Sequence, residues 1–167
     1  MIITEPKWKS WIVQTTTPLF TPEQCRQIIE AGRRQPPQKA QVGMNKPKGG
    51  LDTQKRVTTI SWIPFEEMSH MYKDLNAFIQ KANENHFGFG DIRITEQAQF
   101  TEYPEGGFYD WHMDCDTTME HEPPVRKISM TLLLNDPSEF EGGDLELMAP
   151  GKRVKLKQGH AIIFASF

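Results

Sequence analysis

The chain has 167 residues, of which 37% are hydrophobic and 25% charged, so it is long enough for one domain with its own apolar core and short for two. These proportions exclude wholesale disorder, and a formal net charge of −3 gives no reason to expect nucleic acid or an anionic membrane as the partner. No apolar run could span a bilayer, and the first residues lack the apolar centre of a signal peptide. Two cysteines are too few for a disulfide framework, so we expect a cytoplasmic protein.

The first half of the sequence predicts two helices, with a loop and a strand between them. Thr21 followed by Pro22 is a good helix start, and apolar residues at helical spacing continue to about residue 34. Residues 35–52 are rich in Pro, Gly, Lys and Gln, which predicts a long loop. Strand-forming residues occupy 57–63, and a second helical periodicity covers residues 66–83.

From Asp91 onward the character of the sequence changes to short segments rich in Ile, Thr, Phe, Tyr and Val. Turn signals separate these segments at residues 103–107, 135–138, 141–144, 149–151 and 158–159. Short strands at this spacing predict a sandwich or barrel-like β-fold. We therefore expect a single α+β domain, in which a helical layer (about 1–90) packs on a β-rich core (about 91–167).

The most informative residues for chemistry are His112 and Asp114. Residues two apart on a strand project from the same face, so in a strand these two side chains would point together. An imidazole and a carboxylate on one face are two thirds of the triad that holds non-haem Fe(II). Taken alone the pair is weak evidence, because a histidine hydrogen-bonded to a nearby carboxylate is the commoner occurrence.

The motifs around His112 and Asp114 favour the iron-ligand interpretation over a simple hydrogen-bonded pair. They are residues 103–112, with Tyr-Pro-Glu-Gly-Gly before the histidine, then 126–136, 141–147 and 159–164. In this order and spacing, from about Leu19 to the end, the sequence resembles the prolyl hydroxylase-like branch of the Fe(II)/2-oxoglutarate dioxygenases, and the bacterial and phage PKHD-type hydroxylases in particular. The resemblance implies a double-stranded β-helix, or jelly-roll, with flanking N-terminal helices.

The resemblance also implies roles for individual residues. His112 and Asp114 match the iron ligands of the family. Tyr103 matches a tyrosine that often lines the 2-oxoglutarate pocket, and Tyr109 stands near the metal. The alternating residues Ser129, Thr131 and Leu133 should border the cosubstrate. Several relatives have a tyrosine in place of Leu133, so one hydroxyl contact is missing here or comes from elsewhere. Core packing is an equally good expectation for either tyrosine.

Four further residues have titratable or nucleophilic side chains but weaker grounds for a role. Asp116 and His121 are expected in solvated loops. His160 is a candidate third ligand, although the family's distal histidine comes after the strand that follows it. Cys115 adjoins the ligand pair, but nothing beside it suggests a lowered pKa or a catalytic triad.

The family pattern continues past Phe167, with a distal histidine and then an arginine that binds the far carboxylate of 2-oxoglutarate. The sequence given ends before both. Three explanations remain open: a tail missing from this sequence, a short form that completes its site with another group, and a relative that binds without catalysing.

The resemblance leads us to expect a dioxygenase that uses Fe(II) and 2-oxoglutarate, with ascorbate as a candidate reductant. It would hydroxylate a peptide or protein, a prolyl residue being the favoured target, and release succinate and CO₂. The loop of residues 38–56 is the candidate substrate lid. Two alternatives stay open: the same chemistry on a free amino acid or other small molecule, and a non-catalytic jelly-roll binding protein. The sequence does not indicate an oligomeric state.

Overall fold

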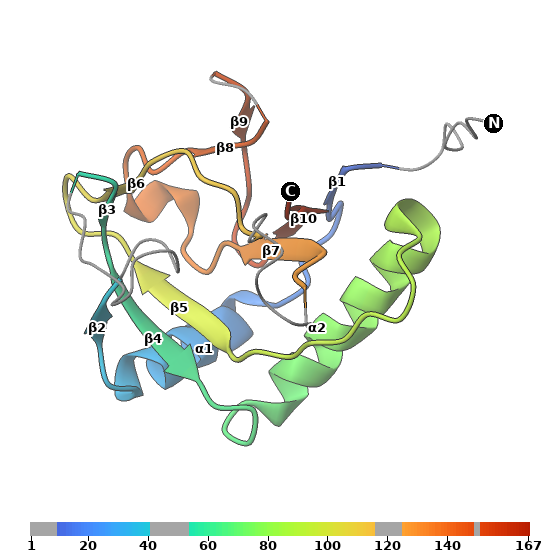
Figure 1. The fold of residues 1–167 in the computed structure, drawn as a ribbon. Coiled ribbons are helices and arrows are strands. Elements are labelled where there is room, and N and C mark those ends of the chain that lie inside the picture. Colours follow the sequence, from blue (N-terminus) through green and yellow to red (C-terminus); the bar gives the residue numbers. More distant parts are fainter. Residues whose placement is uncertain (1–9, 41–53, 116–124, 149–150) are drawn as a thin grey trace.

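The computed structural model describes residues 10–40, 54–115, 125–148 and 151–167. These residues form two α-helices in the first half of the chain and short strands throughout (Figure 1). The helices are α1 (Pro22–Arg34) and α2 (Ser69–Ala82), with a π-helical turn η1 (Asn83–Phe87) and a 3₁₀ turn η2 (Pro137–Glu139). The strands are β1 (Ile12–Gln14), β2 (Gln38–Lys39), β3 (Arg56–Val57), β4 (Thr59–Ile63), β5 (Ala98–Glu102), β6 (Phe108–Tyr109), β7 (Ile128–Leu132), β8 (Leu145–Glu146), β9 (Arg153–Val154) and β10 (Ala161–Ala165).

The strands form small antiparallel sheets that join distant parts of the chain. One sheet has the order β1-β10-β7, so the first strand lies beside the last (Figure 1). A second has the order β2-β4-β5, and two ribbons pair β3 with β6 and β8 with β9. In the β3–β6 ribbon Arg56 stands opposite Tyr109, which brings β3 next to the segment that carries His112.

Helix α1 begins as the sequence predicts. Gln24 donates its backbone N–H to the Thr21 hydroxyl, and the Gln24 side chain accepts from the Thr21 backbone, which completes a capping box. The helix packs close to β5 because residue 32 is glycine: a Cβ there would lie 2.2 Å from Cγ of Phe100. Its inner face buries Cys25 and Ile28.

The main hydrophobic core lies between the two helices and the three-stranded sheets. Its buried members come from both helices, from the second sheet and from Phe20 just before α1: Phe20, Cys25, Ile28, Ala31, Ile63, Met71, Tyr72, Leu75 and Phe100. In β10, Ile162 and Ile163 are almost completely buried. Each such side chain stabilises the fold by about 1.5–3 kcal/mol relative to an exposed position.

Three expected boundaries shift in the structure. The strand predicted over 57–63 is interrupted at Thr58, whose hydroxyl donates to the Glu102 carbonyl at 2.7 Å. The second helix begins at Ser69 instead of residue 66, and past Ala82 it continues as a π-helical turn. The loop predicted over 35–52 contains the short strand β2, and residues 41–53 lie outside the described part. None of the helices in the described ranges combines the length and the apolar character needed to cross a membrane.

Candidate metal centre

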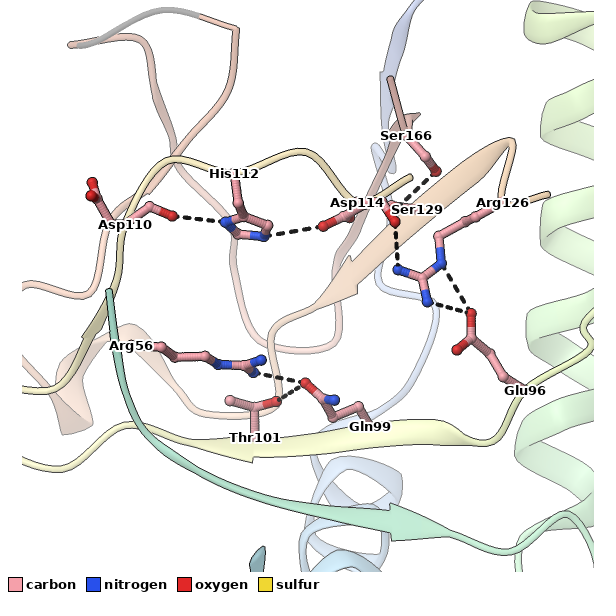
Figure 2. Close-up of polar contacts among 10 residues, drawn as sticks. All are labelled: Arg56, Glu96, Gln99, Thr101, Asp110, His112, Asp114, Arg126, Ser129 and Ser166. Atoms are coloured by element: carbon pink, nitrogen blue, oxygen red, sulfur yellow. Dashed lines mark hydrogen bonds and ion pairs between the residues drawn. The ribbon is translucent and has the colours of Figure 1, made fainter. Parts of the chain in front are cut away.

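His112 and Asp114 lie just beyond the end of β6. The expectation that a strand presents them on one face is wrong, because β6 ends at Tyr109 and residues 110–115 have no regular structure. The two side chains nevertheless converge, with 3.1 Å between Nε2 of His112 and Oδ1 of Asp114 (Figure 2). Their approach therefore depends on bonds from other parts of the chain.

Bonds from the sheet and from Arg126 hold the segment in place. The backbone N–H groups of Asp114 and Cys115 both donate to the Ser166 carbonyl, at 3.2 and 3.0 Å. Nη1 of Arg126 donates to the Asp114 carbonyl at 3.0 Å, and the same guanidinium is paired with Glu96 through Nη2 at 2.6 Å (Figure 2). Position 114 is thus tied to the end of β10 and to the residues that precede β7.

The hydrogen bonds of the imidazole define which nitrogen can bind a metal. Nδ1 of His112 lies 2.8 Å from the Asp110 carbonyl oxygen, which can only accept, so Nδ1 carries the hydrogen. In the neutral ring Nε2 then presents a lone pair toward the carboxylate of Asp114, which also only accepts. This close approach is favourable only if a cation, either a proton or a metal ion, is shared between them.

The pKa values of the pair reflect a shared proton. Burial alone would lower the pKa of His112, but the hydrogen bonds to Asp114 and to the Asp110 carbonyl outweigh it and raise that pKa above its ordinary value. For Asp114, burial would raise the pKa, but hydrogen bonds from His112 and Ser129 and the charge of Arg126 lower it. Asp114 is therefore ionised at neutral pH and available as a ligand.

A divalent metal ion fits the pair. Two ligand atoms about 2.1 Å from a metal and at right angles to each other lie about 3 Å apart, close to the observed separation. Histidine ligands usually donate their second ring N–H to a carbonyl or carboxylate, as His112 does. Among the described residues, no group of three or more His, Cys, Asp or Glu side chains could hold a metal, so the pair is joined by no third ligand there.

Tyr109 and Arg56 form one wall of the site. The Tyr109 ring stacks on the His112 ring with 3.6 Å between centroids and 14° between planes. The guanidinium carbon of Arg56 lies 4.3 Å from the centre of the Tyr109 ring. Arg56 also donates from Nη2 to Gln99 at 2.8 Å (Figure 2), while its buried Nε–H has no partner among the described residues. An incoming oxygen acceptor would satisfy this donor.

The other expected cosubstrate residues are less closely grouped. Tyr103 is half exposed, and burial of its hydroxyl, opposed by the charge of Arg56, raises its pKa. On β7, Ser129 is buried as the alternation predicts, but Thr131 is exposed and Leu133 lies past the end of the strand. The predicted continuous face of these three residues is therefore limited to the start of β7.

His160 lies too far from the pair to complete it. It precedes β10, whereas Asp114 is attached at Ser166 after the other end of that strand, and five strand residues span about 17 Å. Nδ1 of His160 instead lies 3.2 Å from the Thr15 hydroxyl. Asp116, His121 and most of the proposed lid fall outside the described residues.

Two sets of contacts in the site were not predicted from the sequence. Arg56 stands at the end of the loop expected to form the lid, and only the register of β3 with β6 shows that it adjoins Tyr109. Ser166 and Arg126 contact Asp114 through its main chain, which leaves no mark in the pattern of side-chain types.

A family model described as the 2OG-Fe(II) oxygenase superfamily matches residues 98–167, which include Tyr109, His112 and Asp114 but not Arg56. The most similar curated relatives include a PKHD-type hydroxylase from Prochlorococcus marinus, 36% identical over 44% of this chain and 33% of the relative, and one from Acidovorax ebreus, 33% identical over 44% and 35%. A PKHD-type hydroxylase from Synechococcus is 30% identical over 59% of this chain and 46% of its own length. The chain spans a third to a half of these relatives.

Solved structures extend the likeness in fold to most of the chain. A viral collagen prolyl hydroxylase from Paramecium Bursaria Chlorella virus-1, solved as a 2OG complex, has a TM-score of 0.67 with 19% identity, over 93% of this chain and 78% of its own. A prolyl-4-hydroxylase from Pseudomonas putida has a TM-score of 0.62 with 20% identity, over 93% and 80%. Residues 98–167 therefore resemble the 2OG-Fe(II) oxygenase superfamily in sequence, and the fold of the chain is similar to that of two prolyl hydroxylases.

Proposed function

We propose that this chain is an Fe(II)- and 2-oxoglutarate-dependent dioxygenase that hydroxylates a peptide or protein, with a prolyl residue as the favoured target and with succinate and CO₂ as products. The single observation that carries the proposal is the His112–Asp114 pair, in which two lone-pair donors lie 3.1 Å apart and the second imidazole nitrogen is committed to a carbonyl. The match of residues 98–167 to the model of the 2OG-Fe(II) oxygenase superfamily supports the same conclusion.

In this proposal the chain is one domain, and its antiparallel sheets form parts of a double-stranded β-helix with α1 and α2 outside it. The shared fold with two prolyl hydroxylases supports this arrangement. The metal would lie at the open end of the barrel, where the segment of residues 110–115 passes over the ends of β7 and β10 (Figure 2).

His112 and Asp114 would hold the iron, which supplies the redox chemistry that activates O₂ with 2-oxoglutarate as the co-reductant. The protein side chains would orient the reactants. Tyr103, Tyr109, Thr131 and Leu133 are the proposed residues around the cosubstrate. Arg56 faces the same space with an unsatisfied N–H, which suits a carboxylate or a peptide carbonyl oxygen.

The names of the relatives support a peptide or protein as the substrate. The solved neighbours are a collagen prolyl hydroxylase and a prolyl-4-hydroxylase, and the viral enzyme was solved with 2OG. An exposed site also favours a large substrate, since the side chain of His112 is 34% exposed and Trp111 and Met113 beside it are more than half exposed.

The proposal is tested by intact mass spectrometry of Pro-containing peptides incubated with the protein, Fe(II), ascorbate and 2-oxoglutarate, with succinate measured in parallel. We expect a gain of one oxygen on the peptide that is lost in Asp114→Ala and retained in Asp74→Ala, a control on the exposed face of α2. Unchanged turnover in Asp114→Ala would refute the assigned ligand. Succinate formation with a free amino acid, independent of peptide, would refute the peptide substrate.

A further inference from the structure

The side chain of Arg126 connects the ligand-bearing segment to two strands. Arg126 lies two residues before β7, and its Nε and Nη2 both donate to Oε1 of Glu96, at 3.0 and 2.6 Å. Glu96 in turn lies two residues before β5. The third nitrogen, Nη1, donates to the Asp114 carbonyl at 3.0 Å (Figure 2). A single guanidinium group therefore joins the starts of β5 and β7 to the residue that carries the candidate ligand.

Glu96 determines where Nη1 of Arg126 points. The guanidinium is planar and rigid, so a carboxylate oxygen that accepts from both Nε and Nη2 fixes its plane and the direction of its third nitrogen. Hydrogen bonds between charged partners are also shorter and stronger than those between neutral ones. Nη1 is thus aimed at the Asp114 carbonyl by bonds that do not involve the segment of residues 110–115.

The hydrogen bonds around Asp114 hold the peptide groups on both sides of its Cα. The N–H of Asp114 belongs to the peptide group before it and donates to the Ser166 carbonyl at 3.2 Å. In the peptide group after it, the carbonyl accepts from Arg126, and the N–H of Cys115 donates to the same Ser166 carbonyl at 3.0 Å. Because peptide groups are planar, holding two of them leaves Asp114 little freedom in φ and ψ. The direction of its Cα–Cβ bond, and so the approach of its carboxylate, follows from these two angles.

We propose that Arg126, oriented by Glu96, is a positioning residue for the carboxylate of Asp114. It holds the peptide group after Asp114 and thereby keeps Oδ1 beside Nε2 of His112. The inference rests on the proposed metal site and deepens it. The side chains of Arg126 and Glu96 are 40% and 52% exposed, and exposed ion pairs contribute little to stability. Their loss should therefore affect the ligand more than the fold.

The test measures the affinity of the full chain for Mn(II), by electron paramagnetic resonance, together with the melting temperature. We expect Arg126→Gln, which removes the planar fork, to weaken Mn(II) binding about 10-fold. A purely electrostatic role predicts the opposite sign, because removing a positive charge near the site would strengthen the binding of a cation. Wild-type or tighter Mn(II) binding in a folded Arg126→Gln variant would therefore overturn the proposal.

Variants of Glu96 separate orientation from charge. Glu96→Gln loses the charge but keeps an oxygen that can accept from both nitrogens of Arg126, so Mn(II) binding should stay close to that of the wild type. Glu96→Ala removes the acceptor and should weaken binding, though less than Arg126→Gln, because the guanidinium itself remains. Combined with Arg126→Gln it should add no further loss, since Glu96 acts through Arg126. Equal losses in Glu96→Gln and Glu96→Ala would show an effect of charge alone and overturn the proposal.

Arg34→Gln is the matched control. Nε and Nη2 of Arg34 donate to Oε1 of Glu67 at 3.0 and 2.7 Å, so this pair has the same fork on one carboxylate oxygen. It joins the last residue of α1 to the turn before α2. Arg34→Gln should leave Mn(II) affinity unchanged, whatever its effect on the melting temperature. A loss of affinity equal to that of Arg126→Gln would overturn the positioning role.

Metal-free crystal structures separate this inference from the proposed function. If the wild-type chain binds no metal, the proposed function fails, while the positioning role is still decided by comparing wild-type and Arg126→Gln coordinates. We expect the 3.1 Å approach of Oδ1 of Asp114 to Nε2 of His112 to be lost in the variant. An unchanged approach would overturn the positioning role. Normal Mn(II) binding without 2-oxoglutarate turnover would refute only the function.

Discussion

Strand β10 and the segment of residues 110–115 meet at Ser166, but they keep their shapes by different means. β10 has a paired strand on each side, and Ile162 and Ile163 at its centre are 1% and 0% exposed. The segment has no strand partner beyond Tyr109 and is held by separate hydrogen bonds to Ser166, Arg126 and Lys55. The strand is stabilised by many contacts at once, whereas the segment depends on a few.

Because of this difference, β10 mainly determines the stability of the fold, and residues 110–115 mainly determine the position of the ligand atoms. Removing one bond from the segment would displace a ligand without unfolding the sheet beneath it, because the buried strand contributes most of the local free energy. Conversely, a small loss of packing in β10 would lower the free energy of unfolding while leaving the ligand atoms where they are. Substitutions in residues 110–115 should therefore change metal affinity more than stability, and substitutions in β10 should do the reverse.

The largest expected effect is that of Asp114→Ala on metal affinity. Because one of the two available ligands is lost, we expect Mn(II) binding to weaken at least about 100-fold. The free energy of unfolding without metal should change by no more than about 1 kcal/mol, since the ion pair with His112 is partly exposed. Titration with Mn(II) and chemical denaturation measure the two quantities, and a variant that fails to fold would show that the segment is part of the core.

An intermediate effect is expected from pH. A metal competes with the proton on Nε2 of His112, and hydrogen bonds to Asp114 and Asp110 raise the pKa of that imidazole even though burial opposes them. Below this raised pKa, Mn(II) affinity should fall about tenfold for each unit that pH decreases, and it should level off above it. The lowered pKa of Asp114 keeps the carboxylate ionised over this range. Affinities measured between about pH 6 and 8.5 that show no dependence would contradict the assignment of Nε2 as a ligand.

The smallest expected effect is that of Ile163→Val, which removes one methyl group from a fully buried position. Loss of this group should reduce the free energy of unfolding by about 1 kcal/mol. The affinity for Mn(II) should be unchanged, because the main-chain bonds of Ser166 remain in place. Denaturant unfolding and metal titration on the same preparation provide the check. A loss of Mn(II) affinity together with the loss of stability would contradict the separation of the two regions.

Local sequence signals predicted the parts of the fold that depend on neighbouring residues. Thr21 and Pro22 mark the start of α1 because the capping box involves only Thr21 and Gln24. The apolar periodicity of α2 and the strand character of β4 are likewise local. The resemblance stated from the motifs around His112 agrees with the family model that matches residues 98–167.

Local sequence signals could not predict which residues distant in the chain meet at the candidate metal centre. Alternation suggested a strand through His112 and Asp114, but the strand ends at Tyr109 because its partner β3 is only two residues long. The contacts of Arg56 with Tyr109 and of Asp114 with Ser166 join residues that are distant in the chain. A pattern of residue types carries no information about such pairings unless the register of the sheets is known.

The pairing of β1 with β10 has a consequence for biosynthesis. Ile12 on β1 pairs with Phe164 on β10, and the backbone N–H of Asp114 donates a hydrogen bond to the Ser166 carbonyl. While the chain is being synthesised, these partners are missing until residue 166 has left the ribosome, so neither the sheet nor the ligand pair can form earlier. A metal that needs both side chains in place could then bind only after residue 166 has been synthesised.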